Sequence, residues 1–345
     1  VMGEGVYPFR EIVERLGNDK GFDGIPGVAY KKNGEFLKTD FSNSFNLDDF
    51  PFPDRNLTKK YRGRYFSEWM KPLASIRTSK GCPFRCNFCV LWKITDGKYF
   101  KREPEKIVEE LAGIKEEFVF FADDESLVDS KRMIKLAELI KKAGIKKRYY
   151  IYGRSDTIAK NQELLKLWKE IGLERIFIGM EFYRDSDLEY IKKSSTIAQN
   201  EKAVQMLQGI GVNIYASFII RPEYTKQDFR DFIKYIRSLE LQFASFAVLT
   251  PFPKTDFYEQ VKDRMITHEY EYFDLIHTLL PTTLPLKEFY SEYLKIFNKA
   301  IPPLKGIKLL RKFPLREIPH IINITLKWKK RLKNIYLDYE RTGQQ

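Results

Sequence analysis

All three cysteines of this 345-residue chain lie in one short stretch, SKGCPFRCNFCVL, which runs from residue 79 to residue 91. Cys82, Cys86 and Cys89 are spaced as C-x3-C-x2-C. An odd number of clustered cysteines argues against a disulfide framework and indicates a reducing environment. Thiolates this close together are instead typical of a metal site or of a redox-active pair. The motif is therefore the first candidate for chemistry in the sequence.

Three kinds of site compete for this motif. Structural zinc takes four ligands, usually from paired knuckles, and none of the three histidines lies near the cysteines in sequence. A redox-active C-x2-C pair would use Cys86 and Cys89 and would leave Cys82 unexplained. A [4Fe-4S] cluster needs four ligands, so three thiolates on one loop would leave one iron open to a substrate or cofactor. The cluster is the interpretation that we favour.

The elements that must position the motif alternate regularly from Leu73 onward. Short β-branched and aromatic runs are followed by amphipathic helical runs, which is typical of βα units around a parallel sheet. Six units are too few for a closed eight-stranded barrel. We therefore expect an α/β fold with an open, partial (β/α)6 barrel, and a flat doubly wound sheet is the rival. The predicted strands are residues 73–79, 117–123, 148–154, 175–181, 213–220 and 243–249.

Charged residues stand where several predicted strands end. Asp123, Asp124 and Glu125 follow the second strand, Arg154 ends the third and Glu181 ends the fourth. Ligands of both candidate folds bind at the carboxyl ends of the strands. A single charge there can be merely solvated or ion-paired, but the joint alignment favours a site shared with the cysteines.

The cysteine motif, placed after the first strand of a partial barrel, resembles that of the radical S-adenosylmethionine (SAM) superfamily. The resemblance implies that Cys82, Cys86 and Cys89 hold a [4Fe-4S] cluster and that SAM binds the open iron. SAM would there be cleaved to methionine and a 5′-deoxyadenosyl radical. Phe88 stands at the position before the last cysteine, where the family typically has an aromatic residue.

The resemblance also implies roles for the residues at the strand ends. Many members have Gly-Gly-Glu after the second strand to hold the SAM amino group, and this chain departs from that pattern. The role would fall by position to a carboxylate among Asp123, Asp124 and Glu125. Arg154 would meet the SAM carboxylate, and Glu181 would contact the ribose or the amino group.

Stretches on both sides of the motif resemble the cobalamin-binding subgroup of this superfamily. In that subgroup a corrinoid domain precedes the barrel, and residues 3–5, Gly-Glu-Gly, resemble the end of its last strand. The body of such a domain and its Asp-x-His-x-x-Gly pattern are absent from the sequence. SFIIRPEYTKQDF, which carries Arg221, and FDLIHTLLPTTLPLKEFYSEY resemble stretches of hopanoid C-3 methylase-like proteins. Arg221, His277 and Tyr290 are candidates for the substrate side, although a packed histidine and tyrosine is the simpler interpretation of the last two.

The resemblance implies a cobalamin-dependent radical SAM methyltransferase that methylates an unactivated carbon of a hydrophobic, hopanoid-like lipid. The alternative within the subgroup is a cyclase or rearrangement enzyme without methyl transfer. A reductant such as flavodoxin or ferredoxin would be a partner. We expect three parts: the end of a cobalamin-binding-like domain and a linker (1–70), a radical SAM partial barrel (71–255) and a basic, amphipathic helical region (256–345).

The charge of the chain raises two further questions. The formal net charge is +13 and the pI is near 9.3. Lys and Arg are spread along the helices and peak near the C-terminus, where residues 303–341 carry eleven of them against three acids. We expect no nucleic-acid partner, because an RNA-directed methylthiotransferase would bring further cysteines. A basic amphipathic segment suits an anionic membrane surface, or equally a helix packed on the barrel.

The remaining expectations concern location and order. The first residues lack the basic start and apolar run of a signal peptide, and no apolar run is long enough to span a bilayer. We expect a cytoplasmic protein, with peripheral contact at the inner face of the membrane. Pro314 and Pro319 should interrupt the C-terminal helix. A catalytically inactive scaffold with a membrane-docking tail is the third class of function.

Overall fold

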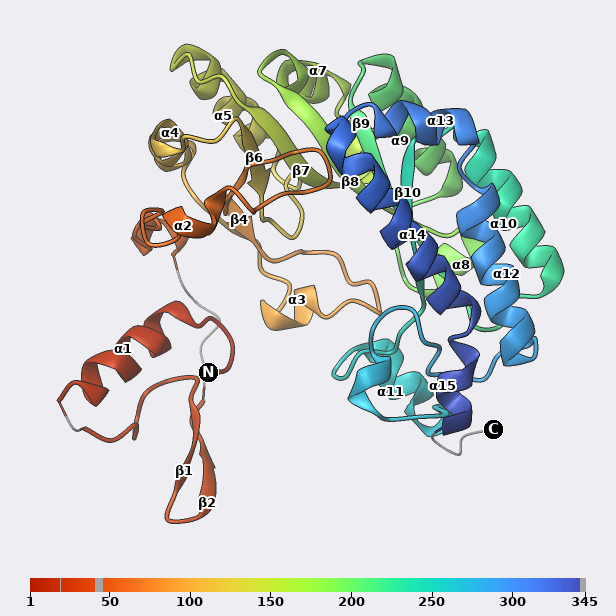
Figure 1. Ribbon diagram of the computed structural model, residues 1–345. Helices are drawn as coiled ribbons and strands as arrows, with labels where there is room; N and C mark the ends of the chain where they lie inside the picture. The colour runs from red at the N-terminus through yellow and green to blue at the C-terminus, as the bar shows by residue number, and fades with distance from the viewer. Residues whose placement is uncertain (19, 41–45, 342–345) are drawn as a thin grey trace.

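The computed structural model describes residues 1–18, 20–40 and 46–341. Within these residues, six parallel strands form one sheet in the order β10-β9-β8-β7-β6-β3 (Figure 1). Each strand lies beside its predecessor along the chain, and the order never reverses as it does in a doubly wound sheet. The predicted partial barrel is therefore confirmed and the flat rival is wrong. The strands are β3 (Leu73–Ile76), β6 (Phe118–Phe121), β7 (Arg148–Arg154), β8 (Leu173–Glu181), β9 (Asn213–Ile220) and β10 (Phe243–Val248).

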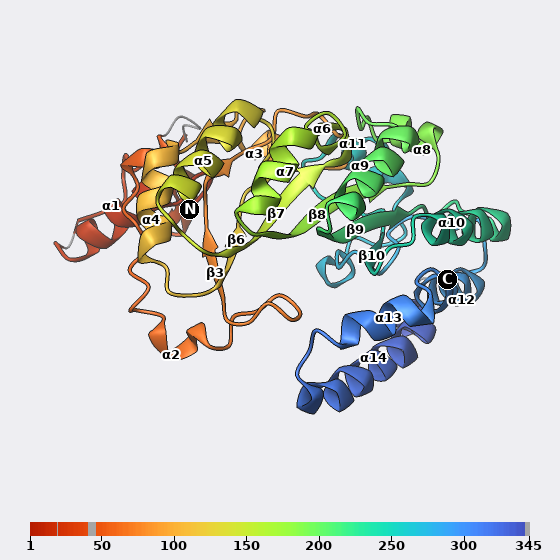
Figure 2. The same ribbon diagram turned by 90° about the horizontal axis from the view of Figure 1, so that it is seen from above.

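Helices between the strands cover the outer face of the sheet. Figure 2 shows α5, α7 and α9 along this face, whereas α2 and α14 lie on the other side. Because side chains alternate along a strand, each strand sends one set outward and one inward. The outward set, such as Phe121 and Ile176, is fully buried against the helices, while inward residues such as Tyr152 and Phe177 keep some exposure. The covering helices are α4 (Pro104–Gly113), α5 (Ser130–Lys142), α6 (Ser155–Ile158), α7 (Gln162–Glu170), α8 (Asp185–Tyr190), α9 (Ile197–Gly209) and α10 (Lys226–Ser238).

The N-terminal segment stands apart from the sheet (Figure 1). It contains α1 (Val6–Leu16), followed by an antiparallel hairpin of β1 (Ala29–Lys32) and β2 (Glu35–Lys38). Asn33 and Gly34 both have positive φ, 53° and 85°, as a type I′ turn requires, so the predicted hairpin is confirmed. Residues 1–5 form no strand in the structure. Two short elements follow, the 3-10 helix η1 (Leu47–Asp49) and α2 (Lys59–Arg62).

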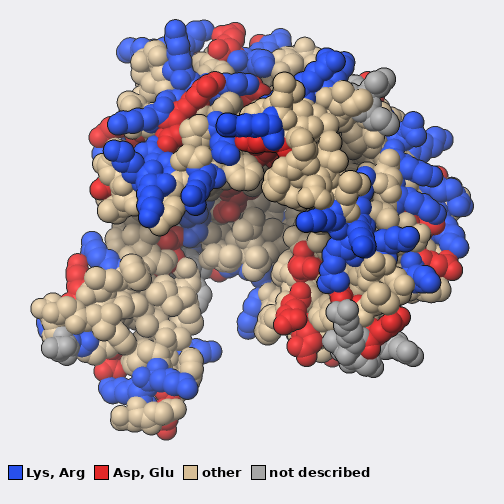
Figure 3. All heavy atoms as spheres, viewed as in Figure 1, with Lys and Arg blue, Asp and Glu red and all other residues tan. Residues whose placement is uncertain are grey.

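The segment after β3 carries the cysteines. β4 (Ser79–Lys80) pairs with β5 (Phe100–Lys101), and the loop between them holds the motif and the short helix α3 (Leu91–Ile94). The surface is hollowed between the N-terminal segment and the C-terminal helices, where Figure 1 places α3 (Figure 3). The motif thus lies on a loop whose two ends are joined by the pairing of β4 with β5.

The chain after residue 255 is helical, as predicted. Trp328 packs with its ring centroid 4.4 Å from that of Phe297, and Leu332 is buried, so α14 lies against α12. Pro314 separates α13 from α14, whereas Pro319 lies in the first turn of α14, where proline is tolerated. No helix in the described ranges is long and apolar enough to cross a membrane. Residues 342–345 of the predicted region lie outside the described residues. The elements are α11 (Asp256–Val261), η2 (Lys262–Arg264), η3 (Tyr270–Tyr272), α12 (Leu286–Lys299), α13 (Pro303–Leu310), η4 (Leu315–Glu317), α14 (Ile318–Lys333) and α15 (Tyr336–Arg341).

Candidate active site

The three cysteines line one cavity of about 140 Å³ at the carboxyl ends of the strands. The structure brings Phe88 and four of the predicted charged residues to the same cavity. Asp123 and Arg221 are not among its lining residues. The lining residues are Cys82, Phe84, Cys86, Phe88, Cys89, Leu91, Asp124, Glu125, Tyr152, Gly153, Arg154, Phe177, Gly179, Glu181 and Lys193.

Two aspartates fix the beginning of the cysteine loop. The Asp123 carboxylate accepts hydrogen bonds from the backbone N–H groups of Thr78 (2.7 Å) and Ser79 (2.9 Å) and from the Thr78 hydroxyl (2.5 Å). Asp124 accepts from the N–H of Gly81 at 2.7 Å. Gly81 has φ 92°, and a Cβ at this position would collide with the carbonyl of Lys98. Asp123 therefore positions the strand that leads into the motif and is fully occupied in doing so.

The middle of the loop is held by the neighbouring backbone. The Trp92 indole N–H donates to the carbonyl of Cys86 at 3.0 Å. The Asn87 side chain donates to the carbonyl of Tyr190 at 2.9 Å, and its backbone N–H donates to that of Ile191 at 3.0 Å. These bonds link the motif to the segment that follows α8, so the loop has a defined path before any ligand binds.

The thiols of Cys82 and Cys89 are neutral groups in the metal-free protein. Burial raises the pKa of Cys82 to about 12 and that of Cys89 to about 11, because a thiolate loses its hydration there. Among the described residues, no three His, Cys, Asp or Glu side chains are already gathered at metal-binding spacing. The donor chemistry nevertheless suits iron and sulfide, since three thiols share one cavity and a bound cation would favour their thiolate forms.

Arg154 brings a positive charge to the cysteine cavity. Its Nε donates to Asp156 at 2.9 Å, its Nη1 lies 3.6 Å from the Cys86 sulfur, and its guanidinium lies 3.7 Å from the ring centroid of Phe84. Its Nη2 is buried and has no hydrogen-bond partner among the described residues. A buried guanidinium N–H without a partner is costly, so this arrangement suits a ligand carboxylate.

Glu181 and Lys193 form an ion pair on the wall of the cavity. The Lys193 ammonium donates to the Glu181 carboxylate and to the Gly179 carbonyl, both at 2.6 Å. Glu181 has φ 63°, which is rare for a residue with a side chain, and a Cβ on Gly179 would collide with its carboxylate. Lys193 is not among the residues predicted from the sequence, because it follows α8 and belongs to no motif. Only the fold brings it to the strand ends.

Glu125 is the most perturbed acid of the cavity. It is buried, and burial raises its pKa to about 8, although the N–H of Leu127 at 3.2 Å and the charge of Arg154 oppose the rise. A buried carboxyl group in this state is protonated at neutral pH in the ligand-free protein. In this form it can donate a hydrogen bond to a ligand.

Arg221 lies at the end of β9 but makes other contacts. Its guanidinium donates to Asp187 at 2.8 Å and to Glu223 at 3.3 Å, and it lies 4.2 Å from the ring centroid of Tyr190. These partners occupy it in an ion-pair network beside the cavity. The structure therefore does not bring Arg221 to the cysteines.

His277 and Tyr290 also lie elsewhere, in the helical C-terminal region. The His277 ring nitrogens lie 2.9 Å from Asp274 and 3.2 Å from Asp338. The Tyr290 hydroxyl lies 2.7 Å from that of Tyr339. Both side chains are buried, and their contacts fasten α15 to the preceding loop. Packing accounts for them.

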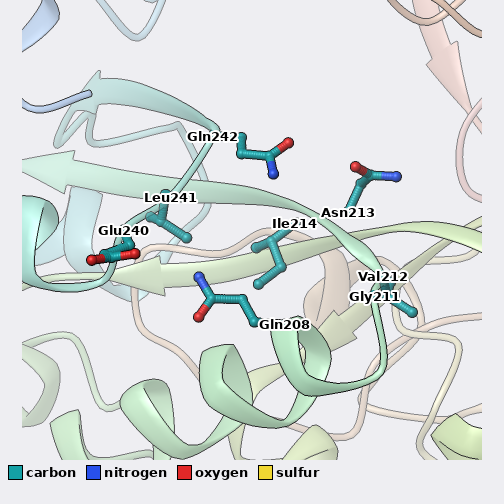
Figure 4. Close-up of a pocket in the computed structure, with 8 residues that line it drawn as sticks. All are labelled: Gln208, Gly211, Val212, Asn213, Ile214, Glu240, Leu241 and Gln242. Atoms are coloured by element: carbon teal, nitrogen blue, oxygen red, sulfur yellow. The ribbon is translucent and has the colours of Figure 1, made fainter. Parts of the chain in front are cut away.

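A second cavity, of about 360 Å³, lies at the opposite, amino-terminal end of β9 and β10 (Figure 4). It is lined by amides, apolar side chains and one carboxylate. In barrels of this kind that end serves stability, whereas chemistry is found at the carboxyl ends of the strands. Its lining residues are Gln208, Gly211, Val212, Asn213, Ile214, Glu240, Leu241 and Gln242.

Comparison with known proteins indicates the family of the chain. The family model of the radical SAM superfamily matches residues 76–236. The chain is 32% identical over 293 residues to hopanoid C-3 methylase of Methylococcus capsulatus. The alignment covers 85% of this chain and 56% of that protein. It is 28% identical over 315 residues to the anaerobic magnesium-protoporphyrin IX monomethyl ester cyclase of Rubrivivax gelatinosus, covering 87% and 56%.

A solved structure supports the same fold. The cobalamin-dependent S-adenosylmethionine radical enzyme OxsB, with aqua-cobalamin and S-adenosylmethionine bound, superposes with a TM-score of 0.71 at 16% identity. The superposition covers 98% of this chain and 56% of that one, so the chain spans little more than half the length of these relatives. The chain carries a radical SAM domain, with the cysteine motif at the strand ends of its partial barrel, and belongs to the radical SAM superfamily.

Proposed function

We propose that this chain is the catalytic barrel of a cobalamin-dependent radical SAM methylase. Its substrate would be an unactivated carbon of a hydrophobic, hopanoid-like lipid. One observation carries the proposal: Cys82, Cys86 and Cys89 line a single cavity with Arg154 and Glu181 at the carboxyl ends of a partial barrel. The relationship to hopanoid C-3 methylase supports the methyl transfer and the class of substrate.

The residues of the cavity suit the proposed cofactors. The three cysteines would hold a [4Fe-4S] cluster and leave one iron for SAM. Arg154, with its unpartnered Nη2, and the Lys193 ammonium would face the SAM carboxylate, while Glu181 would accept from its amino group. When bound, cluster and SAM supply a 5′-deoxyadenosyl radical, and methylcobalamin supplies the methyl group. The protein binds, orients and excludes water.

The inner face of the sheet favours an apolar substrate. Tyr152 and Phe177 line the cysteine cavity, with ring centroids 4.7 Å apart. The row continues through Tyr215, 5.2 Å from Phe177, and Phe243, 4.5 Å from Tyr215. The Tyr152–Phe177 pair offers apolar area at the cavity and suits a rigid ring system, whereas Tyr215 and Phe243 also pack on Arg175.

The cobalamin part of the proposal rests on relatives. OxsB is described as cobalamin-dependent, and it matches this chain over only 56% of its own length. The division into residues 1–70, 71–255 and 256–345 and the partnership with flavodoxin or ferredoxin likewise remain predictions. Peripheral membrane contact and a cytoplasmic location also remain predictions.

The alternative is a radical SAM cyclase or rearrangement enzyme, which the relationship to the ester cyclase favours. The two differ in the fate of the SAM methyl group. SAM labelled with deuterium in its methyl group should yield labelled lipid with the full-length enzyme, cobalamin and a reductant. Formation of 5′-deoxyadenosine with a changed but unlabelled product would instead support the alternative. Absence of 5′-deoxyadenosine from an iron-loaded enzyme would refute both.

A further inference from the structure

Trp92 connects the protein surface with the buried cysteine of the motif. The residue belongs to α3 and is half-buried, and its indole N–H donates to the carbonyl of Cys86 at 3.0 Å. The chain then turns back, so that the N–H of Gly97 donates to the Trp92 carbonyl at 2.6 Å. A molecule that contacts this indole is one hydrogen bond away from the backbone of Cys86.

Two cations flank the same indole ring. The Arg85 guanidinium lies 4.6 Å from the ring centroid and the Lys93 ammonium lies 5.0 Å from it. Gly97 has φ 69°, and a Cβ there would collide with the Arg85 guanidinium, so a glycine is needed for this stacking. Lys93 also forms an ion pair with Asp256 of α11. Two cations and the hydrogen bond to Cys86 therefore hold the indole in place.

The surface around Trp92 has an apolar centre, and the cations around it outnumber the one exposed acid of this loop, Asp96. We call Arg85, Trp92, Lys93, Ile94 and Lys98 the α3 face. Ile94 is 41% exposed, and both Arg85 and Lys98 are exposed. Within the described part of the chain, neither Arg85 nor Lys98 forms a salt bridge within 4.0 Å, so their charge is available to a partner. Small interfaces with complementary charge are typical of transient electron-transfer complexes.

We propose that the α3 face docks an acidic, one-electron carrier protein that reduces the cluster held by the three cysteines. The inference rests on the proposed function, because it needs a cluster at Cys86 and its neighbours. In the transfer the reduced carrier loses one electron and the cluster gains it. No bond between heavy atoms forms or breaks, and no group is exchanged. Charge complementarity selects the carrier, and Trp92 sets where it sits.

The test uses the full chain and a purified acidic flavodoxin. Binding of fluorescently labelled flavodoxin is measured at low salt, with the cluster-free and the reconstituted protein. The double variant R85E/K98E should weaken binding about tenfold or more, because like charges then meet at the rim. R85K/K98R should bind as the original does. Flavodoxin-driven cleavage of SAM should fall with the affinity in the single variant K98E, whereas dithionite-driven cleavage should not change in it, because Lys98 lies outside the stack of Arg85 on Trp92.

A matched control separates local docking from overall charge. K142E/K146E makes the same charge change on exposed residues near the C-terminal end of α5, far along the chain from the motif. It should leave flavodoxin binding unchanged. Equal binding by R85E/K98E and the original chain, or an equal loss with K142E/K146E, would overturn the docking proposal. Loss of dithionite-driven cleavage in every form would count against the proposed function instead, while the binding assay would still decide the docking.

Discussion

Arg154 and Arg175 stand at opposite ends of the same barrel and have opposite surroundings. The Arg175 side chain is completely buried and is paired with Glu68. Its guanidinium lies 4.6–5.3 Å from four aromatic ring centroids. The four rings belong to Trp69, Tyr150, Tyr215 and Phe243. The segment that precedes β3 thus closes the amino-terminal end of the barrel with a caged cation.

Arg154, by contrast, is buried beside a cavity and has fewer aromatic neighbours. It touches one ring, Phe84, pairs with Asp156, and lines the cavity of the cysteines. Both arginines have buried N–H groups without hydrogen-bond partners among the described residues, but only Arg175 has four aromatic faces to compensate. Arginine therefore stabilises the fold at the amino-terminal end of the barrel and can bind a ligand at the carboxyl-terminal end.

The largest effect should come from emptying the aromatic cage. Arg175→Ala removes a fully buried cation, leaves Glu68 without its partner and opens a cavity among four rings. We expect the free energy of unfolding to fall by about 3–5 kcal/mol. Urea denaturation followed by tryptophan fluorescence measures this. A loss below about 1 kcal/mol would show that the amino-terminal end is not held together by this residue.

The buried Glu125 at the carboxyl-terminal end should make the stability of the metal-free protein depend on pH. Burial holds the pKa of Glu125 at about 8, above its unfolded value, so the folded protein binds the extra proton. Its stabilising contribution is complete below the unfolded pKa and is lost as pH rises to about 8, at roughly 1 kcal/mol per pH unit. Denaturation of the metal-free protein from pH 5 to 9 should show this decline, and E125Q should abolish it. An identical pH profile in both forms would contradict the assignment.

Arg154→Ala should affect ligand binding more than folding. Loss of charged hydrogen bonds to the SAM carboxylate should weaken SAM binding to the reconstituted protein about 10- to 100-fold. Isothermal titration calorimetry measures the change. Arg221→Ala is the control, since Arg221 lies outside the cavity, and it should leave the SAM affinity within about threefold. The reverse ranking would exchange the roles that the structure suggests.

The smallest expected effect concerns a single methyl group on the cavity wall. Gly179→Ala places a Cβ against the Glu181 carboxylate and the Lys193 ammonium and so disturbs their ion pair. We expect a several-fold loss of SAM affinity. Gly113→Ala, at a helix end with open space around it, should change nothing or stabilise slightly. Equal behaviour of the two variants would show that the Glu181–Lys193 pair is not needed.

Much of this arrangement could be predicted because it follows from strand periodicity. Aromatic and β-branched runs located the strands, and parallel strands bring their carboxyl ends together. The strand ends therefore predict that Asp124, Glu125, Arg154 and Glu181 lie beside the cysteines, as they do in the structure. The methyl transfer and its lipid substrate, in contrast, depend on family resemblance, because neither is written in a local pattern.

The remaining contacts of the site could not be predicted, because they depend on the orientation of side chains beyond the strand ends. Asp123 follows the same strand as Asp124, yet it turns back to cap Thr78 and Ser79. Arg221 is captured by Asp187, a residue 34 positions away, and Lys193 reaches the cavity from beyond α8. Arg175 lies near the start of β8 with no motif around it, so its cage becomes visible only when four strands and the preceding segment are assembled.

The central claim is that the three-cysteine loop holds a [4Fe-4S] cluster with one iron left for SAM. Electron paramagnetic resonance of the anaerobically reconstituted and reduced chain, recorded with and without SAM, tests it most directly. The account predicts about four irons per chain, a reduced-cluster signal that changes shape on addition of SAM, and loss of that signal in the Cys82→Ala, Cys86→Ala and Cys89→Ala variants. A signal that SAM leaves unchanged, or one that survives removal of the cysteines, would contradict it.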